Sequence, residues 1–562
     1  MIIGLDVGGT HTDVVLLGKN GPVREVKVVT DSSDLFTTVL SALDKITRDI
    51  DLQKIRRVVL STTLTTNAVI QGKSPPVGMI VAAGPGIDPI HFKTCDHFYT
   101  VSGGIDHRGR EISPINAEEI RAISKKLQNN GIEHVGVVSK FSVKNPAHEL
   151  KIAEILNSSF KRLFLGHQYS GRLNFPRRIN TTYLNAATYP LHKKFWQAVK
   201  QSLEEKGLNV PIRILKPDGG NMSFESAVDH PAQSILSGPA ASVMGAVGFA
   251  PKDQECLVLD IGGTTTDMAI LKNGVPLLDP LGIEIEQFRT LIRSLSTCSI
   301  GVGGDSVVHR KKDEVVIGPD RAGMAMAYGG SVPTPTDAMF VLGMGENGDR
   351  KKAVEGISSL AKEWDISVEA AAGKVFTTTC EQILDGARKM IDVTNRKPVY
   401  TVHEIYEDIR IRPTCMLILG GPAPYFKAKL AALSGLDVRV VPRWKVANAI
   451  GAALARTTSE VTLFADTEQG VVKAPGENFS KQIPSNYSKD DAINTALELL
   501  KTKAVRRGAN PDHLQMEVIE EQEFNMVRGF STSGKNIRIR VQVKPGLIRG
   551  YDPMTESMTR DL

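Results

Sequence analysis

Two copies of one octapeptide carry the residues of this sequence that are best suited to chemistry. Residues 6–13 read DVGGTHTD and residues 260–267 read DIGGTTTD, so six of the eight positions are identical. Paired glycines let backbone N–H groups approach a phosphate closely, and the hydroxyls of Thr10 and Thr264 add donors beyond the turn. An apolar strand precedes and follows each copy, so each copy predicts a phosphate-binding β-hairpin.

The aspartates of the two copies suit a metal ion and phosphoryl transfer. Asp6 and Asp260 end their strands, where a carboxylate holds Mg²⁺ through water or orients a nucleophile. We therefore predict Asp6, Asp260 and Asp267 as catalytic residues, with Mg²⁺ on Asp6 and Asp260. A P-loop is excluded, because it needs Gly-Lys-Ser/Thr at the opening of a helix. A fold that kept the hairpins but lost ATP turnover stays open.

A third glycine pair follows a buried strand later in the chain. Gly420, Gly421 and Pro422 come directly after residues 414–419 (TCMLIL). Backbone without side chains lets a purine and its ribose pack against it, so this turn predicts the adenosine site. The pattern is weak alone, and its place after two phosphate hairpins is what favours a nucleotide.

These sites need a scaffold that alternates strands and helices, and the sequence alternates them from its first residues. Strands are predicted over 2–7, 14–17, 57–61, 77–82, 134–138, 211–215, 256–260 and 414–419. Helices are predicted over 34–46, 117–129, 176–205, 446–456 and 489–507, and helices dominate 337–395. The Gly-, Pro- and Asp-rich residues 301–336 are predicted as long functional loops. A polar linker is predicted after about 460, and β-structure over 514–545.

The duplication defines the fold class. We predict an α/β protein of two ribonuclease H-like domains, as in the actin-like ATPases, around an interdomain nucleotide cleft. The predicted divisions are 1–175 with the first hairpin, 176–458 with the second hairpin and the adenosine turn, and 459–562 as a small C-terminal α/β domain.

Composition narrows the class of protein. Hydrophobic residues make up 41% and charged residues 23% of the chain, as in ordinary globular proteins. No apolar run approaches the roughly 18 residues of a membrane span, and the five cysteines show no disulfide or zinc spacing. The net charge of +6 is dispersed and does not indicate nucleic-acid binding. We expect a cytoplasmic protein with no membrane or nucleic-acid partner.

Longer ordered segments add a family resemblance over roughly residues 1–456. Beside the octapeptides, they are 62–68 (TTLTTNA), 141–149 (FSVKNPAHE), 172–190 (RLNFPRRINTTYLNAATYP), 218–222 (DGGNM), 237–242 (SGPAAS) and 334–338 (TPTDA). Together they resemble the hydantoinase A / 5-oxoprolinase family, which includes related subunits of acetone and acetophenone carboxylases.

The resemblance implies a larger set of binding residues. Ser237 and Gly238 would lie beside the phosphates, and Thr62, Thr63 and Asn67 would lie near the interdomain cleft. With the hairpins and glycine turns, the predicted nucleotide-binding residues are Gly8, Gly9, Thr10, Thr12, Asp13, Ser237, Gly238, Gly262, Gly263, Thr264, Thr265, Gly303, Gly304, Gly420, Gly421 and Pro422.

The sequence also departs from the family pattern. Residues 301–306 (GVGGDS) stand where members commonly have GAGGGS, and residues 323–329 (GMAMAYG) lack the usual cysteine and prolines. Residues 84–109 differ too, so we expect these loops to shape the substrate site. Asp305 and Asp337 are candidate cleft residues, with turn-capping and helix-capping as the plainer interpretations. A metal site among the histidines and Cys95 of residues 91–107 stays open.

The resemblance implies ATP-dependent activation of an amide or carbonyl substrate. ATP would phosphorylate the carbonyl oxygen, so that a lactam or imide ring opens or a ketone is carboxylated. A separate hydantoinase B-like subunit would perform the second step, which makes the protein an expected hetero-oligomer. Two alternatives remain: a nucleotide-dependent activator of a partner protein, and a small-molecule kinase.

Overall fold

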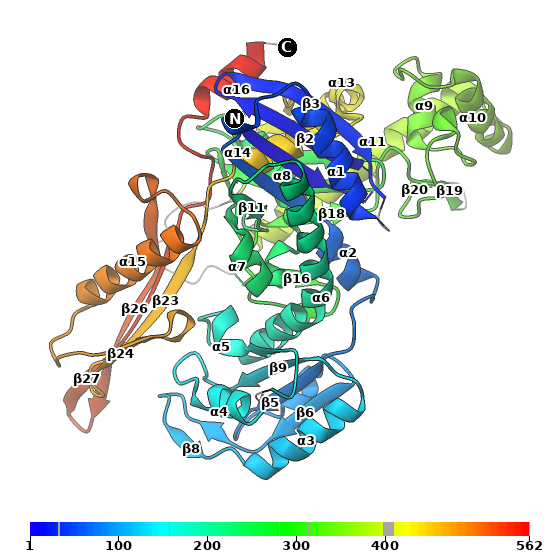
Figure 1. Cartoon of the computed structure of the whole chain (residues 1–562). Helices are drawn as coiled ribbons and strands as arrows, with labels where there is room; N and C mark the ends of the chain where they lie inside the picture. The colour runs from blue at the N-terminus through cyan, green and yellow to red at the C-terminus, as the bar shows by residue number, and fades with distance from the viewer. Residues whose placement is uncertain are drawn as a thin grey trace.

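The computed structural model describes residues 1–9, 11–31, 34–156, 158–279, 281–311, 314–396 and 410–560 (Figure 1). The predicted ligand Thr10 lies outside these residues. Among the described helices, none combines the length and the apolar composition that a membrane crossing requires.

The first half of the molecule is built on a six-stranded sheet with the order β12-β11-β4-β1-β2-β3. The strands β1 to β3 form an antiparallel meander, and β4 and β11 continue the sheet in parallel with β1. The bounds are β1 Ile2–Val7, β2 His11–Gly18, β3 Gly21–Val29, β4 Arg57–Thr62, β11 Ile212–Leu215 and β12 Asn221–Ser223. Helices α1 (Leu35–Thr47) and α6 (Phe175–Glu205) cover one face through a core that includes Leu43 and Trp196.

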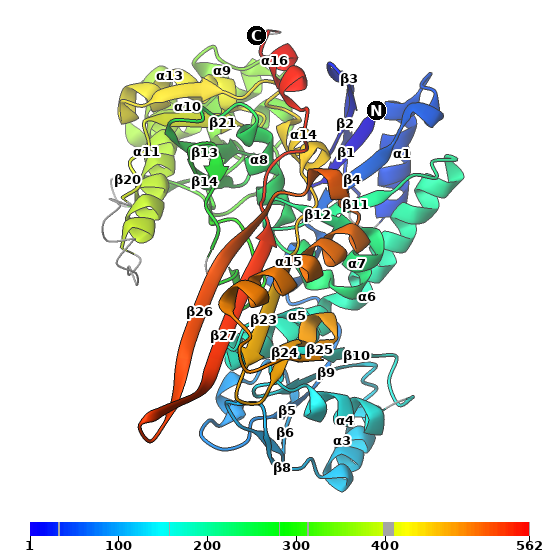
Figure 2. The same ribbon diagram turned by 90° about the vertical axis from the view of Figure 1, so that its left-hand side faces the viewer.

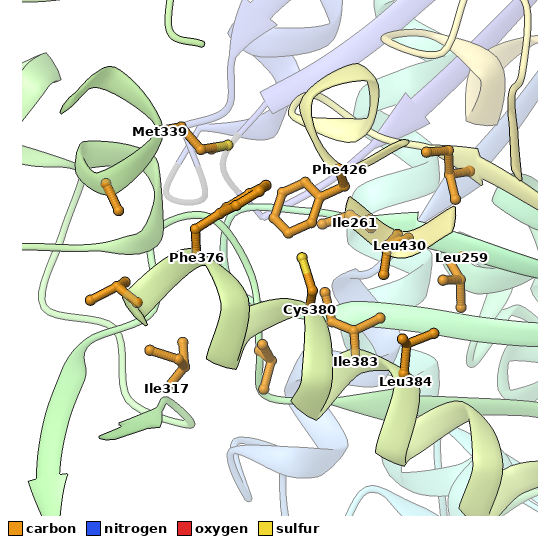
Figure 3. Close-up of a cluster of buried hydrophobic side chains, with 14 of the residues drawn as sticks. Leu259, Ile261, Ile317, Met339, Phe376, Cys380, Ile383, Leu384, Phe426 and Leu430 are labelled. Atoms are coloured by element: carbon orange, nitrogen blue, oxygen red, sulfur yellow. The ribbon is translucent and has the colours of Figure 1, made fainter. Parts of the chain in front are cut away.

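The second half repeats this plan around the second octapeptide. Its sheet has the order β15-β14-β13-β21-β22, and β18 pairs with β14 beside that path. The bounds are β13 Glu255–Ile261, β14 Thr266–Lys272, β15 Val275–Pro276, β18 Thr297–Ile300, β21 Cys415–Leu419 and β22 Asp437–Val440. Helices α11 (Val368–Asn395) and α13 (Ala423–Ser434) cover one face, where Phe376 and Phe426 pack with ring centroids 5.0 Å apart (Figure 3).

Two crossing helices, α8 (Ser237–Val247) and α14 (Ala447–Leu454), lie between the two sheets. Their contact depends on residues without bulk. A Cβ on Gly245 would stand 2.2 Å from the carbonyl oxygen of Ala447, and one on Gly451 would stand 2.2 Å from that of Ala241. Any side chain at these glycines would therefore push the two halves apart.

Two further sheets flank this duplicated core (Figure 2). The parallel sheet β10-β9-β5-β6 is inserted between α2 (Leu64–Ile70) and α6. Its elements are β5 Gly78–Ala82, β6 His97–Val101, α3 Ala117–Asn129, β9 His134–Ser139, α4 Ala147–Leu156 and β10 Arg162–Leu165. The predicted division of the chain into domains stays a prediction, and the first sheet takes strands from both sides of residue 175.

The C-terminal sheet corrects one prediction. Instead of a polar linker after residue 460, the chain forms β23, whose Val461, Leu463 and Ala465 pack beneath α15. Apolar and polar residues alternate there with the period of a half-buried strand. The sheet has the order β25-β24-β23-β27-β26, with β23 Glu460–Asp466, β24 Val471–Ala474, β25 Phe479–Gln482, α15 Lys489–Arg506, β26 Met516–Arg528 and β27 Ser531–Val543.

The remaining segments position the cleft. Within the predicted loop region 301–336, β19 (Val308–Lys311) and β20 (Glu314–Ile317) form a hairpin. Helices α9 (Pro335–Val341) and α10 (Arg350–Trp364) follow it. At the C-terminal end, α16 (Asp552–Arg560) returns to the first sheet, where Met558 packs with Val15 and Leu17.

Candidate active site

The two octapeptides form equivalent hairpins. Asp6 lies directly opposite Asp13 in the β1–β2 register, and Asp260 lies directly opposite Asp267 in the β13–β14 register. Each turn closes with the same backbone hydrogen bond: Gly8 donates to the His11 carbonyl at 3.0 Å, and Gly262 donates to the Thr265 carbonyl at 2.9 Å. The two hairpins thus share their strand register and the backbone hydrogen bond that closes the turn.

Both hairpins open onto one cavity of about 700 Å³. It lies at the junction of the two halves and is also lined by the turn after β21. Of the site residues predicted from the sequence, those that line it are Asp6, Gly8, Gly9, Asp13, Asp260, Gly262, Gly263, Thr264, Gly304, Asp305, Gly420, Gly421 and Pro422. The structure therefore brings the three predicted glycine motifs together.

Other predicted residues lie directly behind the first hairpin. The Ser237 hydroxyl donates to the Thr62 carbonyl at 2.9 Å and accepts from the Thr62 amide at 3.2 Å, so it ties α8 to β4. Thr63 donates its amide to the Val7 carbonyl at 3.2 Å. The described residues that stand behind this hairpin without lining the cavity are Thr12, Thr62, Thr63, Asn67, Ser237 and Gly238.

The rest of the predicted set supports the second hairpin or α9. A Cβ on Gly303 would stand 2.6 Å from the Gly262 carbonyl oxygen, so Gly303 permits close backbone packing. Asp337 is fully buried and completes a capping box with Thr334 at the start of α9. Thr265 and Asp267 belong to the second hairpin, and neither they, Gly303 nor Asp337 line the cavity.

The strand-end carboxylates crowd one another at the base of the cavity. Burial first, and then the nearby Asp13 and Asp260 carboxylates, raise the pKa of Asp6 to about 7. Burial also raises the pKa of Asp260, and burial together with Asp260 raises the pKa of Asp267 to about 7. Asp6 Oδ1 is buried and makes no hydrogen bond of ordinary geometry in the described structure, although the Ser61 hydroxyl lies close enough to the carboxyl to lower its pKa. An unpartnered carboxylate oxygen among other carboxylates fits a cation.

Each strand-end carboxylate is held by one of the two crossing helices. Asn448 on α14 donates its amide to Asp6 Oδ2 at 2.6 Å and to Asp13 Oδ2 at 3.2 Å. Ser242 on α8 donates its hydroxyl to Asp260 Oδ2. Sequence reasoning missed both residues, although a polar residue on each of these small-residue helices was a usable signal.

The cavity also carries cations and an apolar wall that the sequence did not indicate. Lys27 on β3 pairs with Asp13 at 2.8 Å, and Arg321 pairs with Asp305 at 3.2 Å. Lys445 and the exposed His11 line it as well. Apolar and aromatic lining comes from Met324, Tyr328, Met339, Phe340, Tyr425 and Trp444. Such a wall beside the turn after β21 suits a flat ring.

The turn after β21 has the geometry expected of backbone that a ligand approaches. Gly420 has a φ of +96°, and a Cβ there would stand 2.2 Å from the Ile261 carbonyl oxygen. A Cβ on Gly421 would meet nothing within 4 Å, so this residue leaves open space at the cavity. Gly420 therefore serves packing against the second hairpin, and Gly421 keeps the approach clear.

Sequence comparison identifies the family. The hydantoinase/oxoprolinase family matches residues 178–461, and the hydantoinase/oxoprolinase N-terminal region matches residues 2–160. The chain belongs to the hydantoinase/oxoprolinase family. The family resemblance predicted from the motifs is thereby confirmed.

Named relatives lie within this family. The chain is 24% identical to caprolactamase subunit alpha of Pseudomonas jessenii in an alignment of 487 positions that covers 78% of this chain and 68% of that one. It is 23% identical to the acetone carboxylase beta subunit of Xanthobacter autotrophicus, over 81% of this chain and 69% of that one. Against 5-oxoprolinase of Saccharomyces cerevisiae the identity is 22%, over 82% of this chain but only 41% of the relative.

Solved structures confirm the fold. The nucleotide-free acetone carboxylase structure superimposes with a TM-score of 0.70 at 18% identity, and the ATP-dependent caprolactamase of Pseudomonas jessenii with 0.71 at 19%. Both matches cover 98% of this chain and 88% of the other chain. This hydantoinase/oxoprolinase-family protein has the predicted actin-like ATPase fold.

Proposed function

We propose that this protein is the ATP-dependent subunit of an enzyme that phosphorylates the carbonyl oxygen of an amide or carbonyl substrate. One observation carries the proposal: both phosphate hairpins and the glycine turn after β21 line a single cavity of about 700 Å³. Its size lies within the range of roughly 300–1,000 Å³ that is common for small-molecule sites. Relatives named as ATP-dependent caprolactamase and as a subunit of ATP-dependent acetone carboxylase support ATP as the nucleotide.

In this proposal the two hairpins bind the phosphates and the Gly420–Pro422 turn binds the adenosine. Gly8, Gly9, Gly262 and Gly263 offer backbone, and Lys27 and Arg321 offer positive charge on the same cavity. Phosphoryl transfer depends mainly on positioning and charge neutralisation, which these groups can supply. The apolar wall near Tyr425 suits the purine.

Asp6 and Asp260 are the proposed magnesium ligands, since Asp6 Oδ1 is buried and unpartnered. No group of three or more His, Cys, Asp or Glu among the described residues is arranged to enclose a metal. This agrees with Mg²⁺, which commonly takes one or two carboxylates and fills its other positions with water and phosphate oxygens. The bound ion would neutralise charge that develops on the transferred phosphoryl group.

A partner subunit is part of the proposal. The relatives are named as subunits, alpha for caprolactamase and beta for acetone carboxylase. We propose that a hydantoinase B-like protein receives the activated substrate from this chain and completes hydrolysis or carboxylation.

Steady-state ATP turnover tests the proposal. The purified chain is assayed with a series of cyclic amides and ketones, alone and with the protein that co-purifies with it. Turnover stimulated by a small substrate supports the proposal. Turnover stimulated only by the partner protein would instead favour a nucleotide-dependent activator, and a stable phosphorylated product would favour a small-molecule kinase.

A further inference from the structure

A second, smaller cavity lies where the inserted sheet, the first half and the C-terminal sheet meet. It has a volume of about 100 Å³. It shares no lining residue with the cavity of about 700 Å³ that the two phosphate hairpins line, which we call the hairpin cavity. Figure 2 shows α5 (Gly166–Tyr169) beside β23, below α15, and residues of all three elements line the smaller cavity. Residues 167–171, 216–218, 291–293, 459–460 and 476–477 line it, together with Lys503 and Arg507 of the α15 end.

The lining is polar and carries more cations than carboxylates. Four cationic side chains, Lys216, Arg293, Lys503 and Arg507, face three carboxylates, Asp218, Glu460 and Glu477. Two pairs are closed: Lys216 Nζ lies 3.0 Å from Asp218, and Lys503 is bonded to Glu477. Burial first, and then the nearby Arg507 and Arg293, lower the pKa of Lys216 to about 8.

Arg293 is the group that the protein leaves unsatisfied. Its side chain is only 13% exposed, and none of its three guanidinium nitrogens donates a hydrogen bond in the described structure. The Asp218 carboxylate is 3.7 Å from Nε but already accepts from Lys216, Thr458 and the Gly220 amide. Buried guanidinium groups without acceptors are rare in proteins, because their desolvation is costly.

Three further side-chain atoms in the cavity lining have no hydrogen-bond partner among the described residues. The Ser459 hydroxyl is buried in a residue that is 2% exposed and has no partner, so it offers a second donor. Glu460 Oε2 and Gln233 Oε1 also line the cavity as acceptors without donors. A single ligand that accepts several hydrogen bonds and donates one would pair with Arg293, Ser459 and one of the two acceptors.

We propose that this cavity binds a small hydroxylated oxyanion, hydrogen phosphate or bicarbonate, with the Arg293 guanidinium as its main donor. The oxyanion oxygens would accept from Arg293 and Ser459, and its hydroxyl would donate to Glu460 or Gln233. The volume holds roughly three water molecules, which excludes a nucleotide or a cyclic amide.

The site gives a role to the segment 218–222, which the hairpin cavity does not use. A Cβ on Gly220 would stand 2.1 Å from Thr458 Oγ1, so this glycine lets the Asp218 loop seat against the start of the C-terminal sheet. Asn221 donates to the Ala455 carbonyl at 2.7 Å, at the end of α14. The loop that carries Asp218 is therefore tied to the C-terminal end of α14, the helix whose Asn448 donates to Asp6. The proposed oxyanion would lie near that end of α14.

Isothermal titration calorimetry on the full chain tests this proposal. Phosphate, bicarbonate and acetate are titrated separately at matched chloride concentration and with a saturating non-hydrolysable ATP analogue present, so that every phosphate position of the hairpin cavity is filled. We expect saturable binding of phosphate or bicarbonate, and weaker binding of acetate because it has no hydroxyl to donate. Whichever of the first two binds more tightly is the oxyanion that this cavity prefers.

Variants assign the binding to this cavity. Arg293→Gln should weaken it at least about tenfold, whereas Arg388→Gln, an exposed guanidinium on α11, and Lys27→Met, in the hairpin cavity, should not. If circular dichroism shows Arg293→Gln unfolded, Ser459→Ala should still weaken binding severalfold. No saturable heat with the wild type, or unchanged affinity in the folded cavity variant, overturns the proposal. Failure of the ATP analogue to bind the wild type counts against the nucleotide site instead, and the two failures are told apart because the nucleotide and the oxyanion are titrated separately.

Discussion

The two halves of the molecule share their hairpins but differ in the strand that faces them. On β3, Lys27 lies directly opposite Asp13 and pairs with it at 2.8 Å. In the second half β18 takes the equivalent place, and Ser299 lies opposite Asp267. Asp13 lines the cavity beside a cation, whereas Asp267 does not line it and has its pKa raised to about 7 by burial and Asp260. The duplicated backbone therefore carries two different electrostatic environments.

The halves also differ where the next parallel strand ends. The end of β4 continues through Thr62 and Thr63, and Thr62 is bonded to Ser237 of α8. The end of β21 continues through Gly420 and Gly421, which line the cavity. One half thus ties its strand end to a helix, whereas in the other half the strand end lines the cavity. This asymmetry supports the proposed placement of adenosine on the second half.

The largest effect should come from the residues that the halves share. Asp6→Ala and Asp260→Ala should each lower ATP turnover by about 1,000-fold or more, because each removes a proposed magnesium ligand at the phosphates. Steady-state phosphate release measures this. Asp512→Ala, an exposed aspartate in residues 511–513, is the matched control. Near wild-type turnover in Asp6→Ala or Asp260→Ala would contradict the assignment of these residues to the active site.

The next largest effect concerns stability: a fall in pH should destabilise the first half of the molecule more than the second. His192 on α6 is buried beside Ser234 and Thr65, and burial lowers its pKa to about 3. The unfolded state takes up this proton near pH 6.5, so the folded state loses stability as the pH falls below that value. At pH 5 the loss from His192 alone is about 2 kcal/mol. His309, in the second half, is 41% exposed.

Hydrogen exchange at pH 7 and pH 5, corrected for intrinsic rates, measures the expected difference. Amides of α6 in the first half should lose protection at pH 5, and those of α11 in the second half should not. His192→Gln should reduce the change, and His309→Gln should leave it as it is. Equal loss in both helices would contradict the assignment of acid sensitivity to the first half.

The repeated turn motifs could be predicted from the sequence, whereas contacts that depend on how the strands pair could not. Two octapeptides with six identical positions had to form the same turn, and the strand–Gly-Gly pattern at 420 placed the third motif. Lys27 could not be assigned, because its contact with Asp13 depends on which β3 residue faces which β2 residue. Ser237 was expected at the phosphates from the family motif, but its hydroxyl bonds to Thr62 behind the hairpin. Short local patterns specify turns, and tertiary pairing decides which side chains meet.

A pair of variants tests the difference at the facing strand. Lys27→Met should raise the KM for ATP about tenfold, because it removes a cation from the cavity and leaves Asp13 without its ion-pair partner. Ser299→Lys places a cation opposite Asp267, which does not line the cavity, so KM should stay within about twofold. Ser299 is exposed and can accept the longer side chain. A rise in KM for Ser299→Lys without one for Lys27→Met would invert the comparison.

The smallest effect should be equal in the two halves, because the crossing helices contact the aspartates reciprocally. Asn448 of α14 donates to Asp6, and Ser242 of α8 donates to Asp260, each three residues before the glycine at which the helices cross. Asn448→Ala and Ser242→Ala should each lower kcat about fivefold, near 1 kcal/mol for one lost hydrogen bond. Ser358→Ala, whose hydroxyl only bonds within α10, is the control. A loss confined to Asn448→Ala would show that α14 alone positions the site, and the two helices would then differ in function despite their matching contacts.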